Sequence, residues 1–324
     1  MIDIDRKTFQ NYSYIDLFCG IGGFHLALDS LGAKCVFASD IDENARRIYS
    51  RNFNFLPSGD IIKIKNKDIP PHEILCAGFP CQPFSISGNQ QGFQDPRGKL
   101  FFQIIRIARY HKPKIIFLEN VKNFKTHDNG ETLKTVKKEL DKIGYRIFEN
   151  ILVSSNFGIP QARKRLYIVA IKKSLKIKTF TFPIGQKTDK KLKDILIDES
   201  DIYDVSVNRQ FTLDDKPIKR NGLIHVAKIG KGRQGERVYS TDGFATTLSS
   251  QGGGLGGKTG IYLIDGKIRK LYPRECARLM GFPDSFQYAK DINTAYKQFG
   301  NSVVVDVLQN ILVELGNILT NDKE

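Results

Sequence analysis

Short apolar runs alternate with amphipathic segments throughout the first half of this 324-residue chain. Apolar residues between the runs recur at intervals of three and four, which predicts helices over Gly23–Leu31, Glu43–Asn52, Leu100–His111 and Glu131–Ile143. The runs that read as strands are Tyr14–Phe18, Cys35–Ser39, Glu73–Phe79, Lys114–Leu118, Ile147–Ser154 and Leu166–Ile171. Strands and helices that alternate in this way form βαβ units, so we expect an α/β fold with a mostly parallel, doubly wound sheet.

The pattern changes after about Phe182. Residues 185–272 are rich in Gly, Lys and Asp, with short strand-like runs, and Ser249–Gly260 reads SSQGGGLGGKTG, which predicts a long flexible loop. Helical patterns return at Pro273–Met280 and at Ser302–Leu319. The length of the chain allows one large and one small domain, so this part is predicted to form a second, smaller domain.

The composition is that of a soluble globular protein, with 40% apolar and 26% charged residues. Apolar runs such as Val303–Val307 are too short to span a bilayer, so no membrane partner is expected. The start of the chain, MIDIDRKTFQ, lacks the apolar core of a secretory signal. Five cysteines without a CxxC pair argue against a disulfide framework and against a zinc site, and favour a reducing cytoplasm.

The net charge of +15 is large for this length and indicates a polyanionic partner such as a nucleic acid. A merely Lys-rich soluble protein is the alternative, and composition alone leaves both open. Residues 163–178 include seven basic side chains and no acidic one, which favours the polyanion.

A glycine-rich turn follows the first strand, in the sequence DLFCGIGGF. Gly20, Gly22 and Gly23 would let the backbone approach a ligand, and Asp40, at the end of the second strand, is placed to reach ribose hydroxyls. The G-x-G-G spacing differs from the dinucleotide pattern G-x-G-x-x-G, which favours a single nucleoside over a nicotinamide cofactor. Asp60 is a candidate partner for adenine, whereas a plain tight turn remains the alternative.

The stretch GFPCQPFS places Cys81 between two prolines, directly after a strand of the predicted sheet. Ligands of open α/β sheets bind at the carboxyl ends of strands, so Cys81 is a candidate nucleophile, with a small buried apolar residue as the alternative. Glu119, followed by Asn120, ends another strand in KIIFLENV. A half-buried carboxyl has a raised pKa and can donate a proton at neutral pH, although an acid at a strand end can also simply cap a helix.

The stretch QARKR carries Arg163 and Arg165 on alternate positions. These guanidinium groups are candidates to hold a phosphate or a carbonyl oxygen in a bidentate manner. The alternative is a solvated basic face.

Six motifs occur in a fixed order across nearly the whole chain, namely FCGIGG, GFPCQPFSISG, ENV, QARKR, RECARLMGFPDSF and QFGNSV. In this order they resemble the cytosine-5 DNA methyltransferases, most closely the small bacterial HhaI-type enzymes of restriction–modification systems. The resemblance implies a Rossmann-like methyltransferase domain that uses S-adenosylmethionine and releases S-adenosylhomocysteine. It also implies a catalytic and cofactor-binding domain at residues 1–185 and 290–324 and a target-recognition domain at residues 186–289.

By this resemblance, Phe18, Gly20, Gly22 and Gly23 hold the methionine part of the cofactor, Asp40 binds its ribose and Asp60 lies near the adenine amine. Ile41 stands where the family often has an aromatic residue, so apolar packing of adenine is expected. Asn301 and Ser302 would contribute to the cofactor pocket from the far end of the chain, which would make the last helix part of the first domain.

The resemblance also implies the chemistry. The Cys81 thiolate adds to C6 of cytosine, Glu119 protonates or hydrogen-bonds N3, and Arg163 and Arg165 grip O2 and the adjacent phosphate. The target base must be flipped out of duplex DNA, and Pro83–Gly98 would close over it. Gln234 would fill the space left by the base, opposite Ser87.

The residues expected to contact DNA are Ser85, Ser87, Gln234, Arg237, Thr247, Gln251 and Gly254. The recognition loops resemble those of family members that methylate the inner cytosine of GCGC, which is the predicted target, with another CG-centred site as runner-up. Gln251 replaces an aromatic residue and Arg233 replaces a glycine of those relatives. Expected partners are double-stranded DNA and a cognate restriction endonuclease, for a monomer that acts in the bacterial cytoplasm without a metal ion.

Three other functions stay open. An RNA cytosine methyltransferase would share the scaffold but would lack a developed recognition domain. A nicotinamide oxidoreductase is disfavoured by the glycine spacing and by the positive charge. A DNA-binding regulator with an inactive methyltransferase fold is disfavoured because Cys81, Glu119 and Arg165 are all present.

Overall fold

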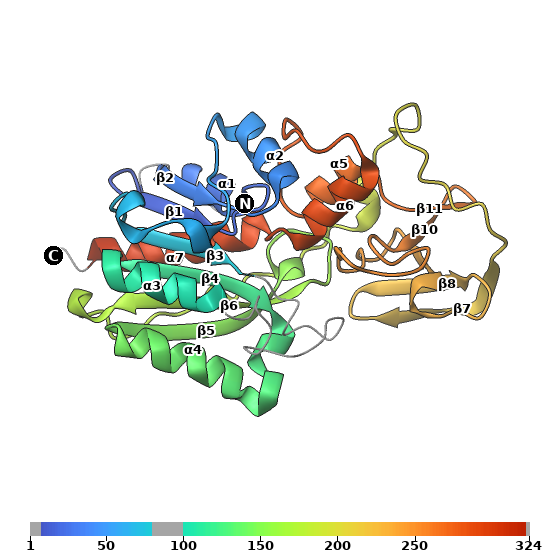
Figure 1. Cartoon of the computed structure of the whole chain (residues 1–324). Coiled ribbons are helices and arrows are strands. Elements are labelled where there is room, and N and C mark those ends of the chain that lie inside the picture. The colour runs from blue at the N-terminus through green and yellow to red at the C-terminus, as the bar shows by residue number, and fades with distance from the viewer. Residues whose placement is uncertain (1–7, 80–99, 322–324) are drawn as a thin grey trace. The chain divides into compact units, whose positions relative to one another are not determined.

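The structure is a computed structural model, and it describes residues 8–79 and 100–321 (Figure 1). The chain forms two compact units, which are described separately. The first consists of Met1–Leu152, Lys164–Ile184 and Val307–Glu324, and the second of Val153–Arg163 and Gly185–Asp306. These units are defined by packing and the expected domains by function, so the domain ranges given above stay a prediction.

The first unit is built on a six-stranded sheet with strand order β2-β1-β3-β4-β6-β5. Its strands are β1 (Ser13–Leu17), β2 (Lys34–Ser39), β3 (Ile74–Gly78), β4 (Ile115–Val121), β5 (Tyr145–Val153) and β6 (Lys164–Lys172). The pairs β1–β2, β1–β3 and β3–β4 are parallel, whereas β6 runs antiparallel to β4. The expected α/β fold with a mostly parallel sheet is therefore confirmed, with β6 reversed.

Helices cover both faces of this sheet (Figure 1). They are α1 (Gly23–Asp29), α2 (Glu43–Phe53), α3 (Phe101–His111), α4 (Glu131–Lys142) and α7 (Val305–Asn321). Local sequence sets their ends: Asp42 caps α2 by accepting hydrogen bonds from the backbone N–H groups of Asn44 and Ala45. At the other end of α2, Asn54 adopts the left-handed conformation that commonly stops a helix.

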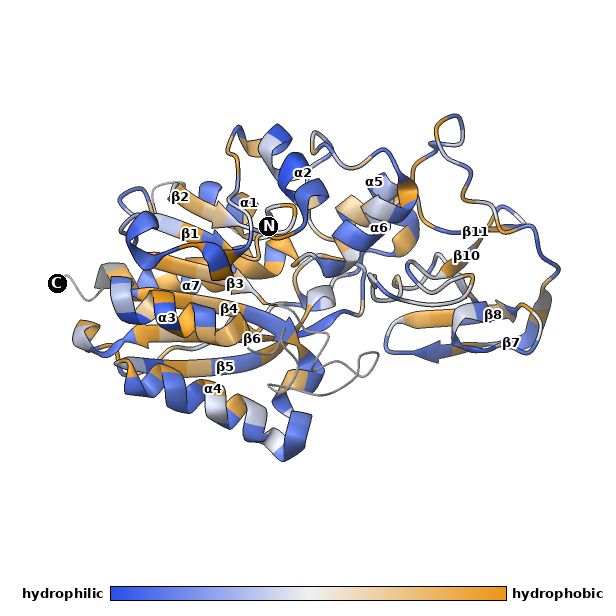
Figure 2. Cartoon of the chain, viewed as in Figure 1, coloured by the Kyte–Doolittle hydropathy of each residue, from blue (hydrophilic) through white to orange (hydrophobic). Residues whose placement is uncertain are grey.

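Side chains alternate across the sheet because successive strand residues point to opposite faces. Ile15 and Leu17 of β1 belong to the main core, together with Ile104 of α3 and Val136 of α4. On the opposite face, Tyr14 stacks edge-on against a residue of α1. Figure 2 shows most strands of this sheet as largely hydrophobic, which fits their burial, whereas the edge strand β5 is more hydrophilic and only partly buried. Asp16 of β1 is also fully buried, which is unusual for a carboxylate.

The second unit contains a five-stranded sheet with order β11-β10-β9-β8-β7 and two helices. The strands are β7 (Thr212–Arg220), β8 (Leu223–Lys228), β9 (Arg237–Ser240), β10 (Ile261–Ile264) and β11 (Lys267–Arg269), and the helices are α5 (Pro273–Arg278) and α6 (Ile292–Asn301). All neighbouring strands are antiparallel except β9 and β10. The predicted short strands are present, and residues 249–260 form turns without a helix or strand.

The sequence did not reveal α6, and the helix expected from Ser302 begins three residues later, at Val305. Ser302 follows α6 in an extended conformation with ψ 166°, which interrupts the helical path between α6 and α7. Ile292–Leu319, which includes α6 and most of α7, is long and apolar enough to cross a membrane by length and composition alone. More than half of its most apolar window is buried inside the protein, as in the core helix of a soluble protein.

Candidate functional site

Glu119 and Arg165 meet at the carboxyl end of β4. Glu119 is 8% exposed, and the Nε atom of Arg165 lies 3.1 Å from its Oε1 atom. The reversed direction of β6 explains the contact, because Arg165 enters β6 directly opposite Val121, where β4 ends.

Asn120 links this pair to the end of β3. Its side chain is 1% exposed, and its Nδ2 atom donates a hydrogen bond to the backbone carbonyl of Phe79 at 3.3 Å. The backbone N–H of Val121 donates to its Oδ1 atom, which fixes the amide orientation. Gly78 pairs with Glu119 in the register of β3 and β4. The predicted residues Cys81, Ser85 and Ser87 lie outside the described residues, just after this anchored strand end.

The glycine-rich turn after β1 is held by Asp40. The backbone N–H of Gly20 donates to one Asp40 oxygen at 2.8 Å, and the backbone N–H of Asp42 donates to the other at 2.8 Å. Burial raises the pKa of the Asp40 carboxyl, and these two N–H donors offset part of that effect. Each carboxylate oxygen retains acceptor capacity for a ligand hydroxyl.

The backbone of this turn is strained at a residue that is not glycine. Phe18 has φ +56°, in the left-handed region, between the end of β1 and Gly20 at φ +53°. Non-glycine residues in this region cost of order 1–3 kcal/mol and cluster at ligand-binding sites. The strain at Phe18 is therefore consistent with a turn shaped for binding.

Two glycines of the turn serve different purposes. A Cβ atom on Gly22 would lie 2.2 Å from the Phe53 ring, so Gly22 permits close packing within the protein. A Cβ atom on Gly20 would meet no atom within 4 Å, so Gly20 faces open space. Gly23 begins α1 and is buried.

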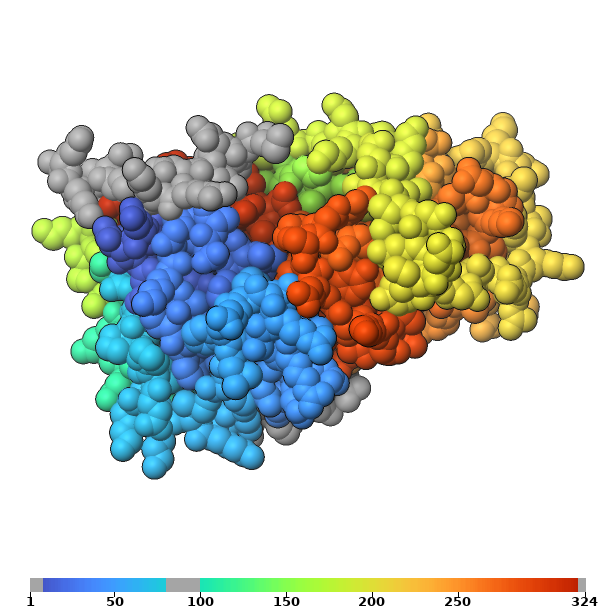
Figure 3. All heavy atoms as spheres, turned by 90° about the horizontal axis from the view of Figure 1, so that it is seen from above, coloured from blue at the N-terminus to red at the C-terminus, as the bar shows by residue number. Residues whose placement is uncertain are grey.

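The segment after β2 carries exposed apolar side chains. Ile41 is 75% exposed, directly after Asp40. Asp60 caps a short 3-10 helix, η1 (Ile61–Lys63), by accepting from the backbone N–H of Ile62. The backbone N–H of Asp40 donates to the carbonyl of Ser58, which ties this segment to the end of β2. Figure 3 shows the same part of the chain at the surface of the first unit.

Asp16 is a buried carboxyl that the sequence reading did not single out. Neither of its oxygens has a hydrogen-bond partner among the described residues. Burial, followed by repulsion from Asp40, raises its pKa well above the usual aspartate value. A buried carboxyl group with a raised pKa therefore lies on β1, the strand that precedes the glycine-rich turn.

Arg163 lies in a buried position within the second unit. Its side chain is 2% exposed and donates to the backbone carbonyls of Leu248, Gly300 and Ser302, all within the second unit. Arg163 therefore joins two separate segments of the second unit by hydrogen bonds. The two arginines of QARKR have different surroundings. Arg165, in the first unit, contacts Glu119.

The predicted DNA-contacting residues of the second unit are exposed, namely Gln234, Arg237, Thr247, Gln251 and Gly254. Gln234 lies in the 3-10 helix η11 (Gln234–Glu236). The next residue, Gly235, accepts a hydrogen bond from the backbone N–H of Gly256 at 2.9 Å, and its Cβ position is 3.1 Å from the carbonyl of Gly253. The two expected recognition loops therefore touch through their glycine backbones. Asn301 is exposed and Ser302 is half-buried.

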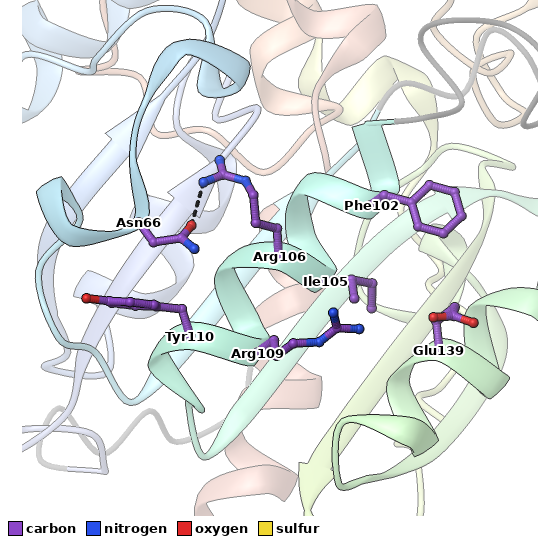
Figure 4. A pocket seen from close by; sticks show the side chains of 7 residues that line it. All are labelled: Asn66, Phe102, Ile105, Arg106, Arg109, Tyr110 and Glu139. Carbon is purple, nitrogen blue, oxygen red and sulfur yellow. Dashed lines mark hydrogen bonds between the residues drawn. The ribbon is translucent and has the colours of Figure 1, made fainter.

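A separate cleft of about 480 Å³ lies on the outer face of α3 (Figure 4). In Figure 4, Arg106 points toward Asn66, and the Arg106 guanidinium also donates to the carbonyl of Ile61. None of the predicted site residues lines this cleft. The polar side chains at the strand ends, and not this cleft, therefore mark the candidate active site. Among the described residues, no group of three or more His, Cys, Asp or Glu side chains could hold a metal ion.

Comparison with known proteins shows the family of this chain. Residues 12–317 match the family model described as C-5 cytosine-specific DNA methylase. The chain is 48% identical to the Type II methyltransferase M.HhaI of Haemophilus parahaemolyticus, over 98% of both chains. It is 41% identical to the Type II methyltransferase M.HpaII of Haemophilus parainfluenzae, over 95% of this chain and 91% of that protein.

Solved structures agree in fold. The Dnmt2 methyltransferase of S. pombe superposes with a TM-score of 0.70 at 24% identity, covering 96% of this chain and 99% of that one. The Entamoeba histolytica methyltransferase EhMeth gives a TM-score of 0.73 at 23% identity, covering 97% and 99%. At these identities the similarity shows the fold alone.

Proposed function

This chain belongs to the C-5 cytosine-specific DNA methylases and is a DNA cytosine-5 methyltransferase of the type II restriction–modification family, and we propose that it flips a cytosine out of duplex DNA and methylates C5 through a covalent bond to Cys81. The family implies S-adenosylmethionine as methyl donor and DNA as substrate.

The observation that carries the proposal is the Glu119–Arg165 pair beside the anchored end of β3. Cys81 follows Phe79 by two residues, and two residues of chain span at most about 7 Å. We propose that the Cys81 thiol acts together with this carboxyl and this guanidinium. These three groups suit nucleophilic addition to cytosine, protonation at N3 and recognition of O2.

Cytosine needs this assistance because its C5 carbon is a poor nucleophile. Addition of the Cys81 thiolate to C6 forms a C–S bond and moves the C5–C6 double-bond electrons toward C5. Glu119 donates its proton or a hydrogen bond to N3, which offsets the charge that develops on the ring, while Arg165 holds O2. As C5 forms its bond to the methyl carbon, the bond from that carbon to the sulfonium sulfur breaks and S-adenosylhomocysteine is released. A base removes the C5 proton, the double bond returns and the thiolate leaves.

The residues of the first unit fit S-adenosylmethionine, which supplies an electrophilic methyl group on a sulfonium. The space beside Gly20 admits a ligand close to the backbone, with Phe18, Gly22 and Gly23 shaping the same turn. Asp40 has acceptor capacity for ribose hydroxyls. Exposed Ile41 offers an apolar surface to adenine, with Asp60 toward its amine. Asn301 and Ser302 complete the proposed set.

The target sequence is the finer part of the proposal. Relatives of the M.HhaI type and the exposed, glycine-lined loops around Gln234, Arg237 and Gly254 support methylation of the inner cytosine of GCGC. Arg237, exposed at the start of β9, can bind O6 and N7 of guanine, a contact worth about 1–3 kcal/mol of discrimination. Thr247 and Gln251 would contact the neighbouring DNA. The protein would act as a monomer in a bacterial cytoplasm and protect DNA from a cognate restriction endonuclease.

Plasmid DNA from cells that express the protein tests the target. A GCGC-cutting endonuclease should fail to cut this DNA, and bisulfite sequencing should detect methylation at the inner cytosine alone. Methylation at a different sequence, with GCGC sites still cleavable, would exclude the GCGC target and leave the reaction intact. An absence of 5-methylcytosine in DNA would contradict the proposed function itself.

A further inference from the structure

The guanidinium of Arg163 connects two segments that are far apart in sequence. Its Nη1 atom donates to the carbonyl of Leu248 at 2.9 Å. Its Nη2 atom donates to the carbonyls of Gly300 at 3.2 Å and Ser302 at 2.8 Å. Leu248 directly follows the proposed DNA contact Thr247, and the other two carbonyls flank the proposed cofactor residue Asn301.

The same two segments also touch without Arg163. A Cβ atom on Gly300 would lie 2.4 Å from the backbone carbon of Ser249 and 2.4 Å from the backbone nitrogen of Ser250. Only glycine permits this approach, because backbone atoms cannot swing away as the end of a side chain can. The end of α6 and residues 249–250 are therefore in direct backbone contact. A displacement of one segment must either displace the other or break this contact.

The residues before Arg163 reinforce this junction. The Gln161 side chain accepts from the backbone N–H of Leu248 at 3.3 Å and donates to the carbonyl of Leu279 at 2.9 Å. The hydroxyl of Thr247 donates to the carbonyl of Ala162 at 3.2 Å. Residues 161–163 thus run alongside residues 245–248 in the second unit and are joined to them by a β-bridge and by side-chain hydrogen bonds.

The geometry requires a guanidinium. Three carbonyls are reached from two nitrogen atoms of one planar fork, an arrangement that a lysine ammonium, with a single nitrogen, cannot reproduce. Arg163 is also almost fully buried, so solvent cannot replace the lost partners.

We infer that Arg163 is a positioning residue that couples DNA binding at residues 246–251 to cofactor binding at the Gly300–Ser302 turn. The inference rests on the proposed function, and it replaces the substrate-gripping role that the sequence suggests for Arg163. Ordering of one segment by its ligand would order the other, so each ligand would raise the affinity of the other by the same factor.

The test is a binding cycle with S-adenosylhomocysteine and a duplex bearing the sequence that bisulfite sequencing identifies. The dissociation constant of the duplex is measured by calorimetry with and without S-adenosylhomocysteine, and their ratio gives the coupling factor. We expect a coupling factor of at least tenfold for the native protein and of less than threefold for Arg163→Lys. Each ligand alone should bind the variant within about fivefold of its native affinity.

Two further variants keep the test decisive. Gln161→Met removes the hydrogen bonds of the Gln161 side chain to Leu248 and Leu279 at nearly constant volume. It should lower the coupling factor partially, even if Arg163→Lys fails to fold. Arg269→Lys is the matched control, because Arg269 is a part-buried arginine of the same unit that pairs with Glu275 at 2.7 Å. It should lower the melting temperature and leave the coupling factor unchanged.

The inference would be overturned if both Arg163→Lys and Gln161→Met kept the coupling factor of the native protein. It would also be overturned if the coupling factor of the native protein were near one. In both cases the proposed function would stand. Failure of the native protein to bind either ligand would contradict the proposed function as well. The two failures are therefore distinguishable.

Discussion

The carboxylate of Glu119 and the guanidinium of Arg165 form an ion pair of 3.1 Å, with side chains that are only 10% and 15% exposed. The two residues are brought together by the reversal of β6 against β4. A charge pair so well shielded from water supports the proposed reaction. Its Glu119 pairs with Gly78 of β3, the strand that precedes Cys81 in the sequence.

Replacing Glu119 by Gln tests whether the Glu119 carboxyl supplies a proton to N3 of cytosine. The amide keeps the shape of the carboxyl but cannot deliver a proton to N3, so the kcat of methyl transfer should fall by about 10²–10⁴-fold. Affinity for S-adenosylhomocysteine should stay within threefold of native. Glu139→Gln on α4, which removes an exposed ion pair with Lys142, is the control and should leave kcat unchanged. Loss of cofactor binding in Glu119→Gln would indicate a structural role in place of the chemical one.

Gly20 and Gly22 form a matched pair for the cofactor turn. Gly22→Ala meets the Phe53 ring and should destabilise the protein by about 1–3 kcal/mol. Gly20→Ala meets no protein atom, so beyond a backbone cost of about 1–2 kcal/mol it should act on the ligand. We expect at least a tenfold weaker dissociation constant for S-adenosylhomocysteine in Gly20→Ala. Native affinity in that variant would show that the turn does not contact the cofactor.

Asp16 should make the stability of the protein depend on pH. Its folded pKa is raised by burial, so the native state holds a proton that the unfolded state releases above the ordinary value of 3.8. The unfolded state then binds fewer protons, and stability falls as the pH rises from that value to the raised folded pKa. The slope from one proton is at most about 1.4 kcal/mol per pH unit.

Asp16→Asn removes this proton linkage at nearly constant volume. The variant should gain melting temperature relative to native protein at pH 8 by more than at pH 5. Thermal unfolding at both pH values, without cofactor, provides the measurement. An equal shift at both pH values would mean that Asp16 does not hold its proton in the folded state.

Substitution of Gln234 tests whether its side chain fills the space left by the flipped base. An exposed amide on η11 can enter that space and replace some of the lost pairing. Gln234→Ala should therefore weaken binding to a normal duplex more than binding to one with a mismatched target base, where flipping costs less. Fluorescence anisotropy on both duplexes gives the comparison, and equal losses would argue against infilling.

The sequence predicted the parts of the fold that local pattern controls. Apolar runs and glycines placed β1, β3 and β4 and the turn at Gly20, because buried strands and left-handed turns need those residue types. It did not predict β7, whose residues are almost all exposed and therefore carry no apolar alternation. The reversal of β6 was equally hidden, since strand direction depends on tertiary pairing and not on the strand's own residues.

The dependence on tertiary contacts also explains why the sequence did not distinguish the two arginines. Arg163 and Arg165 look equivalent as alternate residues of one basic motif, but β6 begins between them. Arg165 follows β6 to Glu119, whereas Arg163 stays in the second unit among three carbonyl acceptors. Which acceptors surround a cation is a long-range property, as is the burial of Asp16 without a partner among the described residues.

The central claim is covalent catalysis by Cys81, and the mass of the protein after reaction tests it most directly. Duplex DNA with 5-fluorocytosine at the target position is incubated with S-adenosylmethionine and either native protein or Cys81→Ser. Fluorine replaces the C5 proton that must leave, so the thiolate cannot be released. The account predicts an adduct with the mass of protein plus methylated DNA for native protein, stable to denaturation, and none for Cys81→Ser. Methylation of ordinary cytosine by Cys81→Ser at a rate near native, or no adduct with active native protein, would contradict it.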